Sequence, residues 1–133
     1  MHLLYVGLTH RETPLPILEK EKSILENIIL STCNRTELYL VVDQLHTGRY
    51  YSKHFLADWF QIPVKELEEY LVFREGDEAL RHLLRVSIGL ESKIIGESQV
   101  LGQLKQALLT AQDAGRTGIV LNQAFKQALT FAK

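Results

Sequence analysis

One stretch of the chain contains two strands and a turn, and it runs Ile28-Ile29-Leu30-Ser31-Thr32-Cys33-Asn34-Arg35-Thr36-Glu37-Leu38-Tyr39-Leu40-Val41-Val42. An apolar run, a polar segment and a second run of β-branched and aromatic residues are typical of two adjacent strands. The only cysteine of the chain, Cys33, therefore lies at the tip between neighbouring strands. A thiol kept for packing would instead lie within one of the apolar runs.

The neighbours of Cys33 favour a reactive thiol. A free thiol has a pKa of about 8.5, so only a small fraction is thiolate at neutral pH. Arg35 would stabilise the thiolate, and free backbone N–H groups of the turn could hold the oxygen of an attacked carbonyl. The alternative is a small buried hydrophobic residue without a chemical role. The turn alone leaves both interpretations open.

The first half of the chain alternates between strand and helix signals. Apolar runs at residues 3–8 and 70–73 predict two further strands. A charged stretch at 17–26 has helical composition, and Thr47-Gly48 is expected to break the chain before a helix at 49–60. The order strand, helix, strand, strand, helix, strand predicts an α+β fold with a ferredoxin-like split βαβ antiparallel sheet.

Strand signals end after residue 74, and three amphipathic helices are predicted from there. Their apolar stripes are Leu80, Leu83 and Leu84, then Leu101, Leu104, Leu108 and Ala111, then Leu121, Phe125, Ala128 and Ala132. We expect a ferredoxin-like αβ lobe over residues 1–74 that carries the cysteine turn. Residues 75–133 are expected to form a helical extension of the same domain.

Composition limits the class of protein. The chain has 133 residues, of which 46% are hydrophobic and 23% charged, which is ordinary for one globular domain with a core. A formal charge of −1 gives no overall basic field for nucleic acid. A single cysteine excludes an internal disulfide, and no apolar run has the length of a membrane span. We therefore expect a cytoplasmic protein. Its five scattered histidines predict no metal site.

The helical half carries polar features that core packing does not explain. An uncharged stripe follows one helix face at spacings of four, three and four residues: Gln99, Gln103, Gln106 and Thr110. It is either a plain solvent face or a surface that hydrogen-bonds a polar ligand or a partner helix. Glycines interrupt the helical pattern and suggest a kink that faces a cleft: Gly89, Gly96 and Gly102. His82 lies off the leucine stripe of its helix and need not belong to the core.

Two separated motifs resemble one enzyme family. Residues 31–37, followed by His82 and the run from 89 to 103, strongly resemble glutamyl-tRNA reductase, and the resemblance extends over nearly the whole chain. It implies an oxidoreductase in which the Cys33 thiolate attacks the ester of glutamyl-tRNA, releases the tRNA and leaves a glutamyl thioester. NADPH then reduces the thioester to glutamate-1-semialdehyde, the first step of tetrapyrrole (porphyrin) biosynthesis from glutamate.

The resemblance also assigns residues and partners. Cys33 and His82 match the catalytic positions of the family, and Arg35 suits the substrate carboxylate because its planar fork binds two oxygens at once. The other substrate-binding positions carry over to Thr32, Asn34, Ser92, Glu97, Ser98, Gln99 and Gln103. Glutamyl-tRNA is the expected substrate. A downstream aminomutase and a homodimer are expected for the full-length enzyme.

The chain departs from the family in three ways. No Gly-x-Gly-x-x-Gly follows a strand, so the NADPH-binding and dimerisation domains are expected to be absent, which leaves thioester formation or ester hydrolysis at most. Ser98 stands where the family has proline. The crossover between residues 8 and 27 is shorter than in the family near Lys20-Glu21. Missing residues there would separate consecutive Cα atoms by much more than about 3.8 Å.

Two other classes of function use the same elements. A non-enzymatic ferredoxin-like ligand-binding module would contain an inert Cys33. A cysteine hydrolase would instead pair the thiol with His82 as its base, which requires the imidazole within hydrogen-bond reach of the sulfur.

Overall fold

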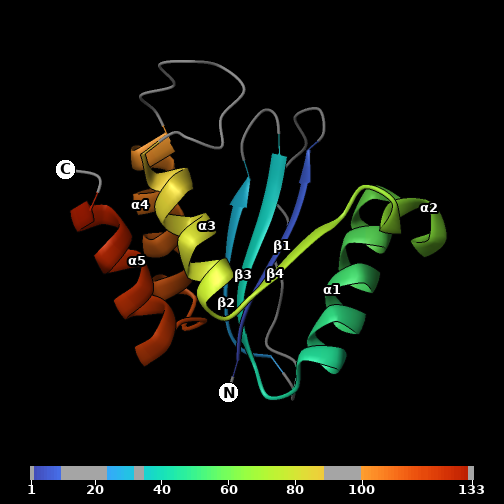
Figure 1. Cartoon of the computed structure of the whole chain (residues 1–133), viewed down its shortest axis with the longest axis horizontal. Helices are drawn as coiled ribbons and strands as arrows, with labels where there is room; N and C mark the ends of the chain where they lie inside the picture. Colours follow the sequence, from blue (N-terminus) through green and yellow to red (C-terminus); the bar gives the residue numbers. More distant parts are fainter. Residues whose placement is uncertain (1, 10–23, 32–34, 89–99, 132–133) are drawn as a thin grey trace.

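The computed structural model describes residues 2–9, 24–31, 35–88 and 100–131 (Figure 1). In chain order the elements are β1 (His2–Thr9), β2 (Ile24–Ser31), β3 (Arg35–Val42), α1 (Leu45–Phe60), α2 (Val64–Glu68), β4 (Val72–Glu75), α3 (Asp77–Ser87), α4 (Val100–Asp113) and α5 (Ile119–Phe131). No described helix has both the length and the apolar composition that crossing a bilayer requires.

The four strands form one sheet in the order β2-β3-β1-β4, and every neighbouring pair is antiparallel. β1 and β2 therefore run in the same direction on either side of β3. Ser31 lies opposite Thr36 in the register of β2 and β3, so these strands are the predicted hairpin. The predicted α+β fold with a ferredoxin-like antiparallel sheet is confirmed.

Helices cover both faces of the sheet, with α1 and α2 on one side and α3, α4 and α5 on the other (Figure 1). Because successive side chains of a strand point to opposite faces, Leu4 and Leu40 pack under α1, whereas Tyr5 and Tyr39 pack under the three C-terminal helices. Most residues of the predicted stripes of α4 and α5 belong to this second core, whereas α3 contributes Ala79, Leu83 and Val86. Phe125 is fully buried there, and truncating such a side chain costs about 3–5 kcal/mol.

Several predicted boundaries are wrong. Residues 24–26 belong to β2 and not to a helical stretch, because Ile24 continues the core on the α1 side of the sheet. Thr47-Gly48 does not break the chain, since α1 begins at Leu45 and runs through both residues. A Cβ on Gly48 would lie 2.7 Å from Cγ1 of Val42, so the glycine allows α1 to approach β3 closely. The last strand, β4, begins two residues later than predicted.

The predicted helix interruption is also wrong where the structure describes it. Gly102 lies inside α4 and is exposed, and no neighbouring atom would crowd a Cβ there. Gly89, Gly96 and the crossover junction at Lys20-Glu21 lie outside the described residues.

A buried carboxylate joins the edge of the sheet to the last helix. Glu26 of β2 is 6% exposed, and its Oε1 accepts hydrogen bonds from the N–H groups of Gly118 at 2.6 Å and Leu121 at 2.9 Å. These groups begin α5, where backbone N–H groups lack partners within the helix and the helix dipole favours a negative charge. Glu26 therefore caps α5 from a strand more than ninety residues away.

The connection between α4 and α5 also closes the free edge of β2. The N–H of Asn27 donates to the carbonyl of Arg116 at 2.9 Å, and the Arg116 guanidinium donates to Oδ1 of Asn27 at 2.9 Å. Burial lowers the pKa of Arg116 from its ordinary value. An edge strand with unpaired backbone groups invites pairing with other chains, and this connection covers part of that edge.

We expect Glu26→Ala to lower the free energy of unfolding by about 1–3 kcal/mol, because two N–H groups at the start of α5 lose their acceptor. Urea denaturation followed by circular dichroism measures this difference. Glu69→Ala is the control, since Glu69 is exposed and its replacement should change stability by less than about 0.5 kcal/mol. Equal stability of the two variants would contradict the capping role.

Candidate functional site

The cysteine turn connects β2 and β3 at the end of the sheet where β1 also ends. β2 ends at Ser31, β3 begins at Arg35, and Arg35 lies opposite Thr9 at the end of β1. The predicted site residues Thr32, Cys33 and Asn34 lie outside the described residues, and of Arg35 only the backbone is described. The register of the hairpin nevertheless makes these residues the link between two paired strands, as predicted.

A buried carboxylate lies on β3 next to this turn. Glu37 is fully buried, and its Oε2 accepts a hydrogen bond from the Tyr5 hydroxyl at 2.8 Å. Its Oε1 accepts from the Tyr39 hydroxyl at 3.0 Å, and Nε2 of His82 lies 3.1 Å from Oε2. The two phenol hydroxyls both donate to this group, which matches the ionised carboxylate, because that form only accepts hydrogen bonds.

The sheet register explains why Tyr5 reaches this carboxylate. Gly7 lies directly opposite Glu37, and Tyr5 lies opposite Tyr39 on the same face. The Tyr5 ring leans along β1 over Gly7, where an added Cβ would overlap its hydroxyl. The glycine therefore leaves the space through which the phenol reaches Glu37.

His82 lies in the core, although helical phase puts it off the leucine stripe of α3. It is 5% exposed, and its ring stacks on Tyr5 with 3.9 Å between the ring centroids. The leucine stripe predicted the wrong centre for the buried face of α3, because Leu80 and Leu84 are only half-buried while Ala79 and Val86 are fully buried beside His82. The sheet determines this face, since it supplies Glu37 as a polar partner for the imidazole.

Glu37 determines how the imidazole is oriented. A carboxylate accepts but does not donate, so Nε2 of His82 carries the proton of their hydrogen bond. Nδ1 of His82 is buried and has no hydrogen-bond partner among the described residues. It is therefore a lone-pair acceptor when the ring is neutral and a second donor when the ring is protonated.

The predicted amide stripe of α4 faces a groove. The groove has a volume of about 120 Å³ and lies between α4 and β2, lined by Ile29, Leu30, Ser31, Gln103, Gln106, Ala107 and Thr110. Oε1 of Gln103 is buried there without a hydrogen-bond partner in the described part of the chain. We call this groove the amide groove. Its wall includes Ser31, the residue directly before Thr32 and Cys33.

The structure describes only some of the remaining predicted site residues. Gln103 and Gln106 share one face of α4 with Thr110, as predicted, and Nε2 of Gln106 donates to Oγ1 of Thr110 at 3.4 Å. Four further predicted site residues lie outside the described residues: Ser92, Glu97, Ser98 and Gln99. Within the described ranges, no group of three or more His, Cys, Asp or Glu side chains is placed to hold a metal ion.

Sequence reasoning missed the partners of His82. Glu37 closes the polar motif at residues 31–37 in the sequence, yet it shares its strand face with Tyr39 and Val41, as alternation along β3 requires. The alternation of side chains along β3 was therefore the sequence feature that could have identified Glu37 as buried. The contribution of Tyr5 had no local signal, because Tyr5 and Glu37 are 32 residues apart in the chain.

Comparison with known proteins points to one family. The family model for the glutamyl-tRNA(Glu) reductase N-terminal domain matches residues 6–133. The glutamyl-tRNA reductase of Streptococcus sanguinis is 86% identical over the whole chain, and that of Bacillus subtilis is 51% identical. The chain covers 36% and 33% of these relatives, or about a third of their length. Both alignments extend over 150 positions, 17 more than the chain has residues.

A solved structure agrees with this similarity. Glutamyl-tRNA reductase from Methanopyrus kandleri superposes with a TM-score of 0.68 and 27% sequence identity. The match covers 96% of this chain and 32% of that one. The similarity therefore includes both the sheet and the C-terminal helices.

The close approach at Gly7 gives a test of the buried carboxylate cluster. We expect Gly7→Ala to lower the free energy of unfolding by about 1–3 kcal/mol, because the new methyl group displaces the Tyr5 ring from Glu37. Gly102→Ala is the matched control, since α4 has open space there and alanine favours a helix by up to about 1 kcal/mol. Chemical denaturation of both variants measures the difference, and equal destabilisation would contradict the proposed packing.

Proposed function

The chain belongs to the glutamyl-tRNA reductase N-terminal domain family, and on that premise we propose that it forms a glutamyl thioester on Cys33 from glutamyl-tRNA. The observation that carries the proposal is the amide groove, whose lining includes Ser31, the residue directly before the proposed substrate-binding and catalytic positions of the turn in the sequence. The groove combines apolar residues with the uncharged amides of Gln103 and Gln106, and it suits the aliphatic and polar parts of an acyl group, because the amides can hydrogen-bond without strong competing charges.

The proposed reaction is acyl transfer to sulfur. The Cys33 thiolate attacks the ester carbonyl carbon, a C–S bond forms, and the bond from that carbon to the ribose oxygen breaks. The ribose oxygen takes up a proton and the tRNA leaves. Arg35 binds the side-chain carboxylate of the glutamyl group through two oxygens. Thr32 and Asn34 hold the group from the turn, and the other proposed contacts come from Ser92, Glu97, Ser98, Gln99 and Gln103.

His82 is the proposed proton-transfer residue, and Glu37 is a positioning residue that acts through it. Glu37 occupies Nε2 of the imidazole, so Nδ1 is the nitrogen left to exchange a proton during the reaction. The hydroxyl groups of Tyr5 and Tyr39 hold the carboxylate in place for this role.

The described residues do not fit NADPH. Dinucleotides bind where a parallel strand leads through a glycine-rich turn into a helix, whereas every strand pair described here is antiparallel. We therefore assign only acyl transfer to this chain's residues. The reduction to glutamate-1-semialdehyde, the homodimer and contact with a downstream aminomutase are proposals for the whole enzyme.

Mass spectrometry after incubation with glutamyl-tRNA tests the proposal directly. We expect a covalent glutamyl adduct that maps to the peptide containing Cys33, and we expect Cys33→Ser to abolish it because the sulfur nucleophile is lost. A non-enzymatic module would give no adduct with the unaltered chain. A cysteine hydrolase would hydrolyse the ester, and no adduct would remain on the protein after free substrate is removed. Either result would overturn the proposal.

A second prediction concerns substrate recognition. Arg35→Lys should raise KM for glutamyl-tRNA roughly tenfold or more while changing kcat less, because an ammonium cannot bind two carboxylate oxygens in the same fork geometry. Single-turnover kinetics of tRNA release at increasing glutamyl-tRNA concentrations measures the half-saturating concentration and the maximal rate that correspond to these constants. Arg85→Lys on the exposed side of α3 is the matched control and should leave them unchanged. A decrease confined to kcat would instead assign Arg35 to activation of the thiol.

A further inference from the structure

Tyr5 contacts the surroundings of the proposed proton-transfer residue, His82, in two ways. Its hydroxyl donates to Oε2 of Glu37 at 2.8 Å, and Nε2 of His82 lies 3.1 Å from that same oxygen. Its ring also stacks on the imidazole, with 3.9 Å between the ring centroids and 34° between the ring planes. A carboxylate oxygen has two lone pairs, so it accepts hydrogen bonds from both groups at once.

Tyr39 contacts the same carboxylate differently. Its hydroxyl donates to Oε1, the other oxygen of Glu37, at 3.0 Å. Its ring lies edge-on to Phe125, with 5.3 Å between the centroids, and is tilted against the ring of Tyr5 at 5.5 Å. Tyr39 therefore holds the carboxylate through the oxygen opposite the one at the imidazole, whereas Tyr5 holds the oxygen at the imidazole itself.

The imidazole needs more than its hydrogen bond to stay in one orientation. A hydrogen bond at Nε2 fixes one atom of the ring and leaves the ring able to tilt about that atom. The neighbouring positions along α3 are filled, because Ala79 and Val86, three residues before and four residues after His82, are fully buried. The Tyr5 ring adds a restraint on one face of the imidazole, and the Tyr5 hydroxyl fixes the oxygen at Nε2.

The position of the imidazole proton decides which nitrogen can take part in proton transfer. When the proton is on Nε2 and is donated to Glu37, the lone pair of the neutral ring is on Nδ1. A neutral imidazole without this hydrogen bond exchanges between two tautomers, and only one of them leaves the lone pair on Nδ1. A residue that fixes the tautomer therefore changes the rate of proton transfer without contacting the substrate.

We propose that Tyr5 is a positioning residue for His82, which holds the neutral imidazole in the tautomer with the proton on Nε2 and the lone pair on Nδ1. Stacking keeps the ring in place, and the hydroxyl keeps Oε2 of Glu37 where Nε2 binds it. This inference rests on the proposed role of His82 in acyl transfer. Tyr5 is 4% exposed and lies on the face of β1 that packs under the C-terminal helices, so it acts through His82.

NMR of the imidazole nitrogens in histidine-labelled chain tests the tautomer without any measurement of activity. At a pH where the ring is neutral, a protonated ring nitrogen and one with a lone pair give separate signals, and His82→Gln identifies the signals of His82. We expect the parent chain to carry the His82 proton on Nε2 alone. Tyr5→Leu removes both the stacked ring and the hydroxyl and should give both tautomers, and Tyr5→Phe should give a smaller share of the second one.

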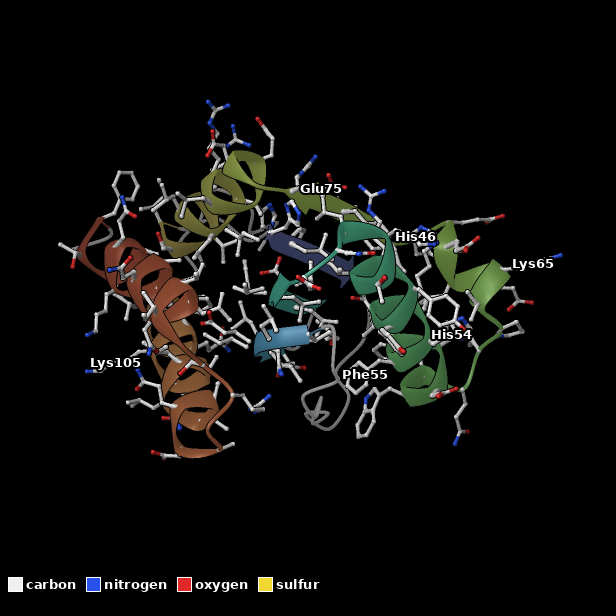
Figure 2. The ribbon with its side chains drawn as sticks, turned by 90° about the horizontal axis from the view of Figure 1, so that it is seen from below. His46, His54, Phe55, Lys65, Glu75 and Lys105 are labelled. Atoms are coloured by element: carbon white, nitrogen blue, oxygen red, sulfur yellow. The ribbon has the colours of Figure 1, made fainter. Side chains whose placement is uncertain are left out.

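Two other histidines serve as internal references for this measurement. Figure 2 shows His46 and His54 of α1 on the opposite side of the sheet from Lys105 of α4. Tyr5 packs on the α4 side, in the same core as Leu104. The signals of His46 and His54 should therefore be the same in the parent chain and in both Tyr5 variants.

Single-turnover kinetics tests the consequence for the reaction. Tyr5→Phe should lower the maximal rate of glutamyl-adduct formation on Cys33 roughly fivefold, which corresponds to the loss of one hydrogen bond. The half-saturating concentration of glutamyl-tRNA should not change, because Tyr5 acts through His82. Tyr39→Phe also loses one buried hydrogen bond and should lower Tm to a similar extent, but it should lower the rate only about twofold because it acts on the other oxygen.

Tyr70→Phe is the matched control for the removal of a phenol hydroxyl. Tyr70 is 65% exposed and belongs to neither core, so this variant should have the rate and the Tm of the parent chain.

Two results would overturn the inference. One is an equal loss of rate in Tyr5→Phe and Tyr39→Phe, because the two hydroxyls would then act alike on the carboxylate as a whole. The other is a His82 proton that stays on Nε2 alone in both Tyr5 variants, and Tyr5→Phe decides this point if Tyr5→Leu does not fold. A parent chain that forms no adduct would overturn the proposed function, and the tautomer measurement would still decide the role of Tyr5.

Discussion

The carboxyl group of Glu37 is fully buried, so hydrogen bonds from other parts of the protein must satisfy it, and the packing beside β3 depends on this. An unpaired charge at such a position would cost several kcal/mol or more. Its partners come from three elements, because Tyr5 lies on β1, Tyr39 on β3 and His82 on α3. The hydrogen bonds to this one side chain thus set the position of α3 against the sheet. Glu37 lies on β3, the strand that follows the cysteine turn.

The helical half is attached to the sheet by buried polar groups as well as by apolar packing. Glu26 caps α5, and Arg116 exchanges hydrogen bonds with Asn27 at the edge of the sheet. Leu104 and Phe125 also pack in the same core as Tyr39. This shared core supports the proposal that residues 75–133 extend the domain formed by residues 1–74. Hydrogen bonds add direction to that packing, because each requires a particular position of the helix.

The local sequence pattern predicted which strands and helices form better than it predicted the residues at which they begin and end. Short apolar and β-branched runs identified all four strands, since such runs are typical of strands with a buried face. Gly48 was misread as a chain break because its role is to let α1 approach Val42, a contact that local sequence does not contain. For the candidate site, the turn motif and the stripe of Gln103 and Gln106 were recognisable from spacing. The burial of His82 was not, because its partner Glu37 is 45 residues away.

The sequence by itself determined the strand order along the chain, the hairpin that brackets Cys33, the apolar faces of α4 and α5 and the family resemblance. Each of these depends on residues close together in the chain or on a motif within it. Only the tertiary structure decided that Glu37 and Glu26 are buried partners of distant groups, and that α4 forms the amide groove with β2. The physical reason is that a polar side chain is stable in a core only where the fold brings donors to it, and local sequence does not specify those donors.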